Sequence, residues 1–136
     1  MPNGPLSIFH VAGRAMSAQL VRMNTTASNL ANAGGIAGSA DTAYKTLKPV
    51  FRTSFDAATG LSTVDVEKIV KAGEDPTKRH DPNNPLADKD GNVFEAAVDE
   101  TRELVDMMET ARTYQNNVEV MQTAKSLILD TLKLGR

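Results

Sequence analysis

A chain of 136 residues with only 4% aromatic residues is long enough for one domain, whose core must rely on aliphatic, Met and Ala contacts rather than on large rings. That composition favours paired helices over a β-sandwich. The net charge of −2 excludes a global electrostatic field for nucleic acid or acidic lipid. The absence of cysteine excludes a disulfide framework and any Cys-based metal or nucleophile site.

The N-terminal sequence MPNGPLSIFHVAGRAM is not typical of a secretory signal peptide. It lacks a charged n-region, and its apolar run is interrupted by His10 and Gly13. The chain also lacks the run of about 18 apolar residues that a bilayer span requires. We therefore expect no membrane insertion, and any export must use a route without a cleaved signal.

An apolar seam with alternating spacings of three and four residues predicts a helix over about 6–33. Pro5 suits the first helical turn, and Gly34 with Gly35 suits its end. The members of this seam are Phe9, Ala12, Met16, Leu20, Met23, Ala27 and Leu30.

The stretch NTTASNLANAGG at 24–35 is the weakest part of this predicted helix. Its first six residues include two Asn, two Thr and one Ser, which together are worse helix formers than alanine by about 2–3 kcal/mol. The same stretch also carries apolar seam residues that need a partner. This conflict predicts that the stretch becomes helical only when it is packed.

The central 34–97 segment differs in character from both ends. YKTLKPVFRTSF at 44–55 and LSTVDVEKIV at 61–70 predict two strands of a hairpin that turns at 56–60. The sequence GEDPTKRHDPNNPLADKDGN predicts an extended loop with tight turns, and Val93 with Phe94 predicts a short third strand. AGGIAG, which begins at Ala33, is interpreted as a flexible connector because it lacks the Lys and Ser/Thr of a phosphate-binding loop.

A second helix is predicted over about 99–134. Asp99 is a suitable N-cap, and Glu100 and Glu103 lie in the first turn, where the helix dipole favours acidic residues. Lys125 falls on the seam, along which its aliphatic stem can lie. The apolar seam of this helix consists of Leu104, Met107, Ala111, Tyr114, Val118, Met121, Ile128 and Leu132.

The predicted fold class is mainly α: long terminal helices paired as an antiparallel coiled coil, with a small β-rich or irregular insert between them. The predicted segments are an N-terminal helix segment at 1–33, a middle segment at 34–97 and a C-terminal helix segment at 98–136. A single seam between two helices leaves most of the surface of each helix exposed to solvent. We therefore expect that one chain alone has a marginally stable core and that other chains complete it.

No constellation of side chains predicts catalysis, and we expect no catalytic, cofactor-binding or metal site. His10 and His80 lie in different predicted elements, so each is assigned a structural or surface role. DKDGN at 88–92 resembles part of a calcium loop but lacks the Glu that an EF-hand needs at position 97, and it is interpreted as a turn.

Both ends of the chain resemble one known family. AMSAQLVRMNTTASNLANA at 15–33 is similar to the N-terminal signature of bacterial flagellar axial proteins of the rod and hook, and 98–135 resembles their C-terminal helix. NPLADKDGNV followed directly by VDETRELVDMM resembles the proximal-rod members. NAGGIAG departs from the polar run that the family often has there.

This resemblance implies a structural subunit that polymerises helically into the basal-body rod and is exported by the flagellar type III apparatus without a cleaved signal. In the family the terminal helices form the inner tube around the export channel, and the middle segment packs outside. The implied partners are other copies of the chain, other proximal and distal rod proteins, the MS ring or export-gate region and the export apparatus, with no nucleic acid and no direct membrane insertion.

The candidate assembly interface combines the two seams with the polar residues of the NTTASNLANA stretch. Alternatives that stay open are a different axial protein, such as another proximal-rod or hook-basal-body adaptor subunit, an unrelated coiled-coil adaptor, and a peptidoglycan enzyme, which would need an acidic pair in a cleft. The predicted interface residues are Phe9, Met16, Leu20, Met23, Asn24, Ala27, Ser28, Asn29, Leu30, Asn32, Leu104, Met107, Ala111, Tyr114, Val118, Met121, Ile128 and Leu132.

Overall fold

The computed structural model describes residues 4–135, which form two compact units. The first unit contains residues 4–23, 49–68 and 108–135, and the second contains residues 24–48 and 69–107. The predicted terminal segments 1–33 and 98–136 therefore extend by a few residues beyond the described part of the chain.

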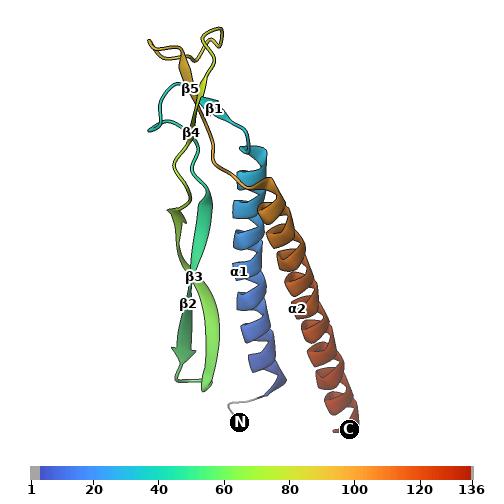
Figure 1. Cartoon of the computed structure of the whole chain (residues 1–136). Coiled ribbons are helices and arrows are strands. Elements are labelled where there is room, and N and C mark those ends of the chain that lie inside the picture. Colours follow the sequence, from blue (N-terminus) through green and yellow to red (C-terminus); the bar gives the residue numbers. More distant parts are fainter. Residues whose placement is uncertain (1–3, 136) are drawn as a thin grey trace. The chain divides into compact units, whose positions relative to one another are not determined.

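Two long helices dominate the chain. Helix α1 spans Pro5–Ala31 and helix α2 spans Glu100–Leu134, and within each unit they lie side by side and run in opposite directions (Figure 1). This arrangement confirms the predicted antiparallel helix pair. Among residues 4–135, neither helix contains a stretch long and apolar enough to cross a bilayer.

The helix ends follow the local rules that the sequence predicted. Pro5 occupies the first position of α1, where its missing N–H costs nothing, and Gly34 follows the helix with a φ of 72° that favours glycine. The Asp99 carboxylate accepts a hydrogen bond of 3.1 Å from the Arg102 N–H, which confirms Asp99 as the N-cap of α2.

Strands β2 (Leu47–Asp56) and β3 (Leu61–Lys71) form a two-stranded sheet. They are joined by a turn at 57–60, which confirms the predicted hairpin (Figure 1). The Asp56 carboxylate accepts the Ala58 N–H at 2.9 Å, and Gly60 has a φ of 67°. The Thr63 hydroxyl is buried and donates to the Ser54 carbonyl across the two strands.

The second unit contains a three-stranded antiparallel sheet in the order β1-β5-β4, with β1 at Ile36–Ala37, β4 at Thr77–His80 and β5 at Asn92–Glu95. Strand β5 confirms the predicted short strand. The interpretation of AGGIAG as a flexible connector was wrong, because Ile36 and Ala37 pair with Glu95 and Phe94.

The predicted loop over GEDPTKRHDPNNPLADKDGN was also wrong in part, because it contains β4. All four residues of β4 are exposed, so the strand lacks the apolar alternation that would have revealed it. DKDGN is a turn, as predicted. The Asp88 carboxylate accepts N–H groups from Asp90 and Asn92 at 2.9 and 2.8 Å.

The buried core is made of small and polar residues. The largest fully buried side chains in the described residues are Val93, Thr110 and Asn29, with exposed fractions of 0%, 0% and 2%. Among the helix side chains that the structure describes, the other buried positions are Ala or Thr, apart from Glu103, and none is Leu, Ile or Met. Small side chains let packed helices approach closely, but they bury little apolar area. The remaining buried helical residues are Ala12, Ala18, Thr25, Thr26, Glu103 and Ala124.

Candidate assembly interface

The predicted interface residues of α1 differ widely in exposure. Asn29 is buried, whereas Leu20 is 44% exposed. The exposed members are Leu20, Asn24, Ala27 and Asn32, and the half-buried members are Phe9, Met16, Met23, Ser28 and Leu30.

On α2 the buried side chains lie on a different face of the helix from the predicted apolar seam. The buried positions Glu103, Thr110 and Ala124 each precede a predicted seam position by one residue. One residue along a helix corresponds to about 100° of rotation. Leu104 and Leu132 are consequently 53% and 63% exposed, whereas the half-buried members are Met107, Ala111, Tyr114, Val118, Met121 and Ile128.

The helices of the first unit also expose large apolar side chains that the seam prediction missed. Leu127 is 55% exposed and Leu134 is 87% exposed. These residues lie off the three-four alternation that was used, so the predicted seam does not include them. Their hydrophobic character was the only available signal. The missed residues in this unit are Leu6, Ile8, Met108, Val120, Leu127, Leu129 and Leu134.

Asn29 forms the centre of a hydrogen-bond network within the second unit. Its Oδ1 accepts the Tyr44 hydroxyl and the Leu47 N–H, each at 2.8 Å. Its Nδ2 donates to the Leu47 carbonyl and to Glu103 Oε2, each at 3.0 Å. An amide side chain offers two donors and two acceptor sites, and all four are used within the chain. The structure therefore places Asn29 in the interior of the chain, with no side-chain group left for a neighbouring chain.

The other polar residues of the stretch have separate environments. The Ser28 hydroxyl lies 3.1 Å from the Tyr44 hydroxyl, and Asn32 Nδ2 donates to the Ser28 carbonyl at 2.8 Å. Asn24 is exposed. The Asn24 and Asn32 side chains are therefore accessible on the surface of the second unit.

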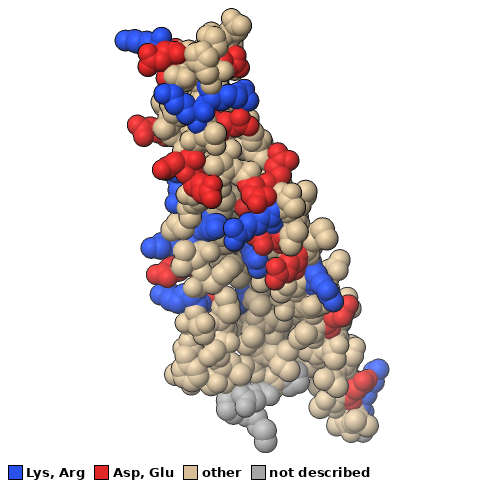
Figure 2. All heavy atoms as spheres, viewed as in Figure 1, with Lys and Arg blue, Asp and Glu red and all other residues tan. Residues whose placement is uncertain are grey.

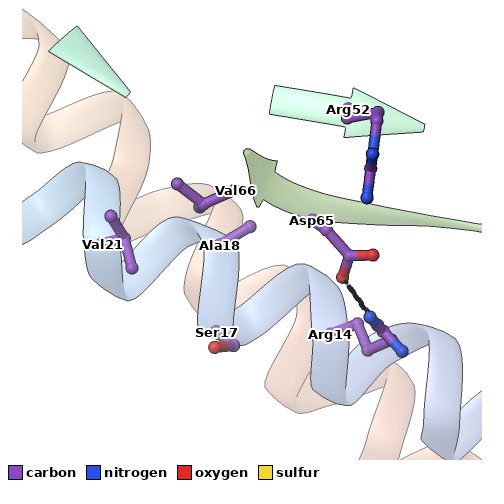
Figure 3. Close-up of a pocket in the computed structure, with 7 residues that line it drawn as sticks. All are labelled: Arg14, Ser17, Ala18, Val21, Arg52, Asp65 and Val66. Atoms are coloured by element: carbon purple, nitrogen blue, oxygen red, sulfur yellow. Dashed lines mark hydrogen bonds and ion pairs between the residues drawn. The ribbon is translucent and has the colours of Figure 1, made fainter. Parts of the chain in front are cut away.

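A groove in the first unit lies between α1 and the β2–β3 hairpin (Figure 3). It has a volume of about 550 Å³ and carries charged groups on both walls. Arg14 on α1 binds the Asp65 carboxylate on β3, with Nη2 and Nε at 2.6 and 2.7 Å from Oδ1. The remaining lining residues are Ser17, Ala18, Val21, Arg52 and Val66.

Charge is distributed without a dominant sign on the visible surface. Figure 2 shows Lys and Arg side chains interspersed with Asp and Glu side chains on the face drawn, in keeping with the net charge of −2. Among residues 4–135, no group of three or more His, Asp or Glu side chains is placed to hold a metal ion. Exposed apolar side chains on the two helices are a further feature of the described surface.

Both ends of the chain match families of flagellar rod proteins. Residues 9–35 match the family described as flagella basal body rod protein, and residues 90–134 match the C-terminal family of the flagellar basal body rod proteins FlgEFG. The flagellar basal-body rod protein FlgC of Salmonella typhimurium is 41% identical over 133 residues, which cover 96% of this chain and 98% of that protein. FlgC of Yersinia enterocolitica is 40% identical over 131 residues, with the same coverage. The chain belongs to the FlgC family of flagellar basal-body rod proteins.

Proposed function

We propose that this chain polymerises helically through its terminal helices to form part of the proximal rod, the tube that serves as drive shaft and export channel of the flagellum. The family to which it belongs is structural and non-enzymatic. The observation that carries the proposal is the exposure of large apolar side chains along both helices, among them Leu20, Leu127 and Leu132 at 44%, 55% and 63%.

These side chains have a large free energy to gain from assembly. Complete burial of a Leu or Met side chain contributes about 1.5–3 kcal/mol, whereas the intrachain core buries mainly Ala and Thr. Contact between two different surfaces of successive subunits does not close on itself and generates an open helical polymer. The exposed apolar faces thus supply the driving force, and the heterologous contact supplies the geometry.

The proposed interface keeps the accessible members of the predicted set. The half-buried members of the predicted set lie beside these accessible residues on the same helices. The buried Asn29 is assigned to folding of the subunit instead. The accessible members are Leu20, Asn24, Ala27, Asn32, Leu104 and Leu132.

The remaining parts of the proposal concern place and partners. The partners are other copies of the chain, other proximal and distal rod proteins, and the MS ring or export-gate region. The segments 1–33 and 98–136 build the inner rod, and 34–97 packs outside them. The chain reaches the periplasmic rod through the flagellar type III apparatus without a cleaved signal. A different axial protein is a weaker alternative, because the 41% identity to FlgC extends over 96% of the chain.

Incorporation of variants into basal bodies tests the interface. Leu20→Asp and Leu132→Asp place a charge on surfaces that are exposed in the subunit, so folding is retained, but burial of an unpaired carboxylate opposes assembly. Ala57→Asp adds the same charge to the exposed hairpin turn and serves as the control. We expect both leucine variants to be absent from basal bodies purified from cells that lack the native gene, and the control to be present. Normal incorporation of both leucine variants would overturn the proposed interface.

The purified subunit provides a second test. Because its core is small, we expect a monomer whose terminal helices are cut rapidly by protease and become protected in the rod. Sedimentation and limited proteolysis measure this behaviour. A cooperatively melting monomer with both helices protected before assembly would contradict the coupling of folding to polymerisation.

A further inference from the structure

The groove of the first unit carries more positive than negative charge. It contains two guanidinium groups, from Arg14 and Arg52, and one carboxylate, from Asp65 (Figure 3). Arg14 is bonded to Asp65, whereas Arg52 is exposed and forms no hydrogen bond or ion pair within residues 4–135. The groove therefore keeps one positive charge that has no partner among the described residues of its own chain.

The shape of the groove suits a carboxylate side chain with an apolar neighbour. Ser17 and Ala18 are small, so the α1 side of the groove leaves room for an incoming side chain. Val21 and Val66 add apolar contacts beside the charged groups. An exposed carboxylate and an adjacent aliphatic side chain would complement both features.

Such a pair occurs on α2 of the same unit. Glu119 is exposed and forms no hydrogen bond or ion pair within the described part of the chain, and Val120 beside it is 46% exposed. Most other carboxylates of the unit are occupied. Asp65, Glu109 and Asp130 have basic partners, and Asp56 closes its own turn. Among the described residues of the unit, Glu67 is the other carboxylate without a partner, and it lies on β3 beside Lys68, within a strand that lines the groove itself.

We propose that in the rod the Arg52 groove of one subunit receives Glu119 and Val120 of a second copy of this chain. This inference rests on the proposed function and specifies one contact within it. The groove and the Glu119 surface belong to different elements of one unit, so the contact is head-to-tail and repeats from copy to copy. Burial of the pair at an interface strengthens the attraction between Arg52 and Glu119 relative to water.

A charge swap tests this contact. Arg52→Glu and Glu119→Arg are each expected to lower the number of chains per purified basal body by about tenfold or more. Each substitution places two charges of the same sign opposite each other at the proposed contact. The double variant restores opposite charges and is expected to return to within about twofold of the native chain. Lys68→Glu, on the same hairpin, reverses an exposed charge outside the groove and should assemble normally.

Cross-linking supplies a readout that does not depend on variant stability. The chain contains no cysteine, so Ser17→Cys combined with Val120→Cys carries the only two thiols. Treatment of assembled rods with a short bis-maleimide should yield a ladder of linked copies, and each single-cysteine variant should yield none.

Assembled rods without a ladder, or links from Ser17→Cys to a different rod protein, would overturn the contact with a second copy. Normal assembly of Arg52→Glu, or a double variant no better than the single variants, would overturn it as well. In each of these cases the native chain still enters the rod, so the proposed function stands. Absence of the native chain from basal bodies would instead refute the proposed function.

Discussion

Asn29 and Glu103, which are 74 residues apart in sequence, are joined by a hydrogen bond of 3.0 Å between Nδ2 and Oε2. Both residues are buried, with exposed fractions of 2% and 7%. The bond links the C-terminal part of α1 to the first turn of α2 within the second unit. Because Asn29 also binds both backbone groups of Leu47, it connects both helices to the start of β2.

Asn29→Ala should open this part of the second unit. The substitution leaves the Leu47 N–H and the Glu103 carboxylate buried without their partner, and each unsatisfied group costs about 1–3 kcal/mol. We expect hydrogen exchange of the Leu47 amide to accelerate by about tenfold or more, measured by NMR or mass spectrometry.

Two further variants separate the network from general damage to α1. Asn32→Ala removes an exposed amide that binds only its own helix, and it should leave Leu47 exchange nearly unchanged. Glu103→Gln keeps an acceptor for Asn29 but removes a buried charge, so it should be far milder than Asn29→Ala. Equal exchange rates in all three variants would show that the network does not hold the unit closed.

The parts of the fold that sequence predicted are those governed by local rules. Helix α1 begins at Pro5 and is followed by a left-handed Gly34, and α2 begins after its Asp99 cap. These signals act within one helical turn, so they can be identified without knowledge of the partner elements. The β2–β3 hairpin was equally predictable, because its turn and strands are contiguous.

The parts that sequence missed depend on contacts between distant residues. Ile36 and Ala37 become a strand only because β5 lies beside them, and the exposed β4 has no apolar pattern of its own. Helix periodicity predicted that each helix has a seam but selected the large Leu104 over the buried Glu103, because hydrophobicity was the only criterion. The internal role of Asn29 required knowing that Tyr44, Leu47 and Glu103 surround it.

Two glycines with the same backbone conformation offer a test of local packing. Gly91 and Gly60 have φ values of 75° and 67°, which cost an L-residue about 1–2 kcal/mol. A Cβ at Gly91 would also lie 3.0 Å from the Pro82 Cβ and 3.1 Å from the His80 Cε1, whereas a Cβ at Gly60 meets nothing within 4 Å. Gly91→Ala should therefore lower the free energy of unfolding by about 1–3 kcal/mol more than Gly60→Ala does.

The effect of each glycine variant should be local. Gly91→Ala should accelerate exchange of the Asp81 amide, which donates to the Gly91 carbonyl at 2.9 Å. Gly60→Ala should change only amides of the hairpin turn. If the two variants lowered protection equally in their own turns, the close approach to Pro82 would have no energetic consequence.

The hairpin turn should respond to acid through Asp56. The hydrogen bond from the Ala58 N–H, followed by that of the Thr59 hydroxyl, holds the pKa of the Asp56 carboxyl below its usual range. A carboxyl whose pKa is lower in the folded state stabilises that state above the unfolded pKa of about 3.9 and loses this contribution as pH falls through the folded pKa. We expect the Ala58 amide resonance to titrate with a midpoint below that unfolded value.

Asp56→Asn is the matched variant for this titration. The amide oxygen can still accept the Ala58 N–H, but the side chain has no charge to lose. Its Ala58 resonance should therefore be insensitive to acid over the same range. A midpoint at or above the unfolded pKa in the native chain would show that the turn does not favour the charged carboxylate.

Asn24 and Thr26, two positions apart in the NTTASNLANA stretch, should respond in opposite directions to substitution by alanine. Asn24 is exposed, so Asn24→Ala gains helix propensity of about 0.5–0.7 kcal/mol without loss of packing. Thr26 is 4% exposed, and Thr26→Ala gains a similar propensity but leaves a cavity where a methyl and a hydroxyl were packed. Amide exchange across residues 24–31 should slow in the first variant and accelerate in the second. The low helix propensity of this stretch is then explained at Thr26 by packing and at Asn24 by its position on the accessible surface of the proposed interface. If both substitutions slowed exchange, propensity alone would control the stretch, and the buried threonines would contribute nothing to the fold.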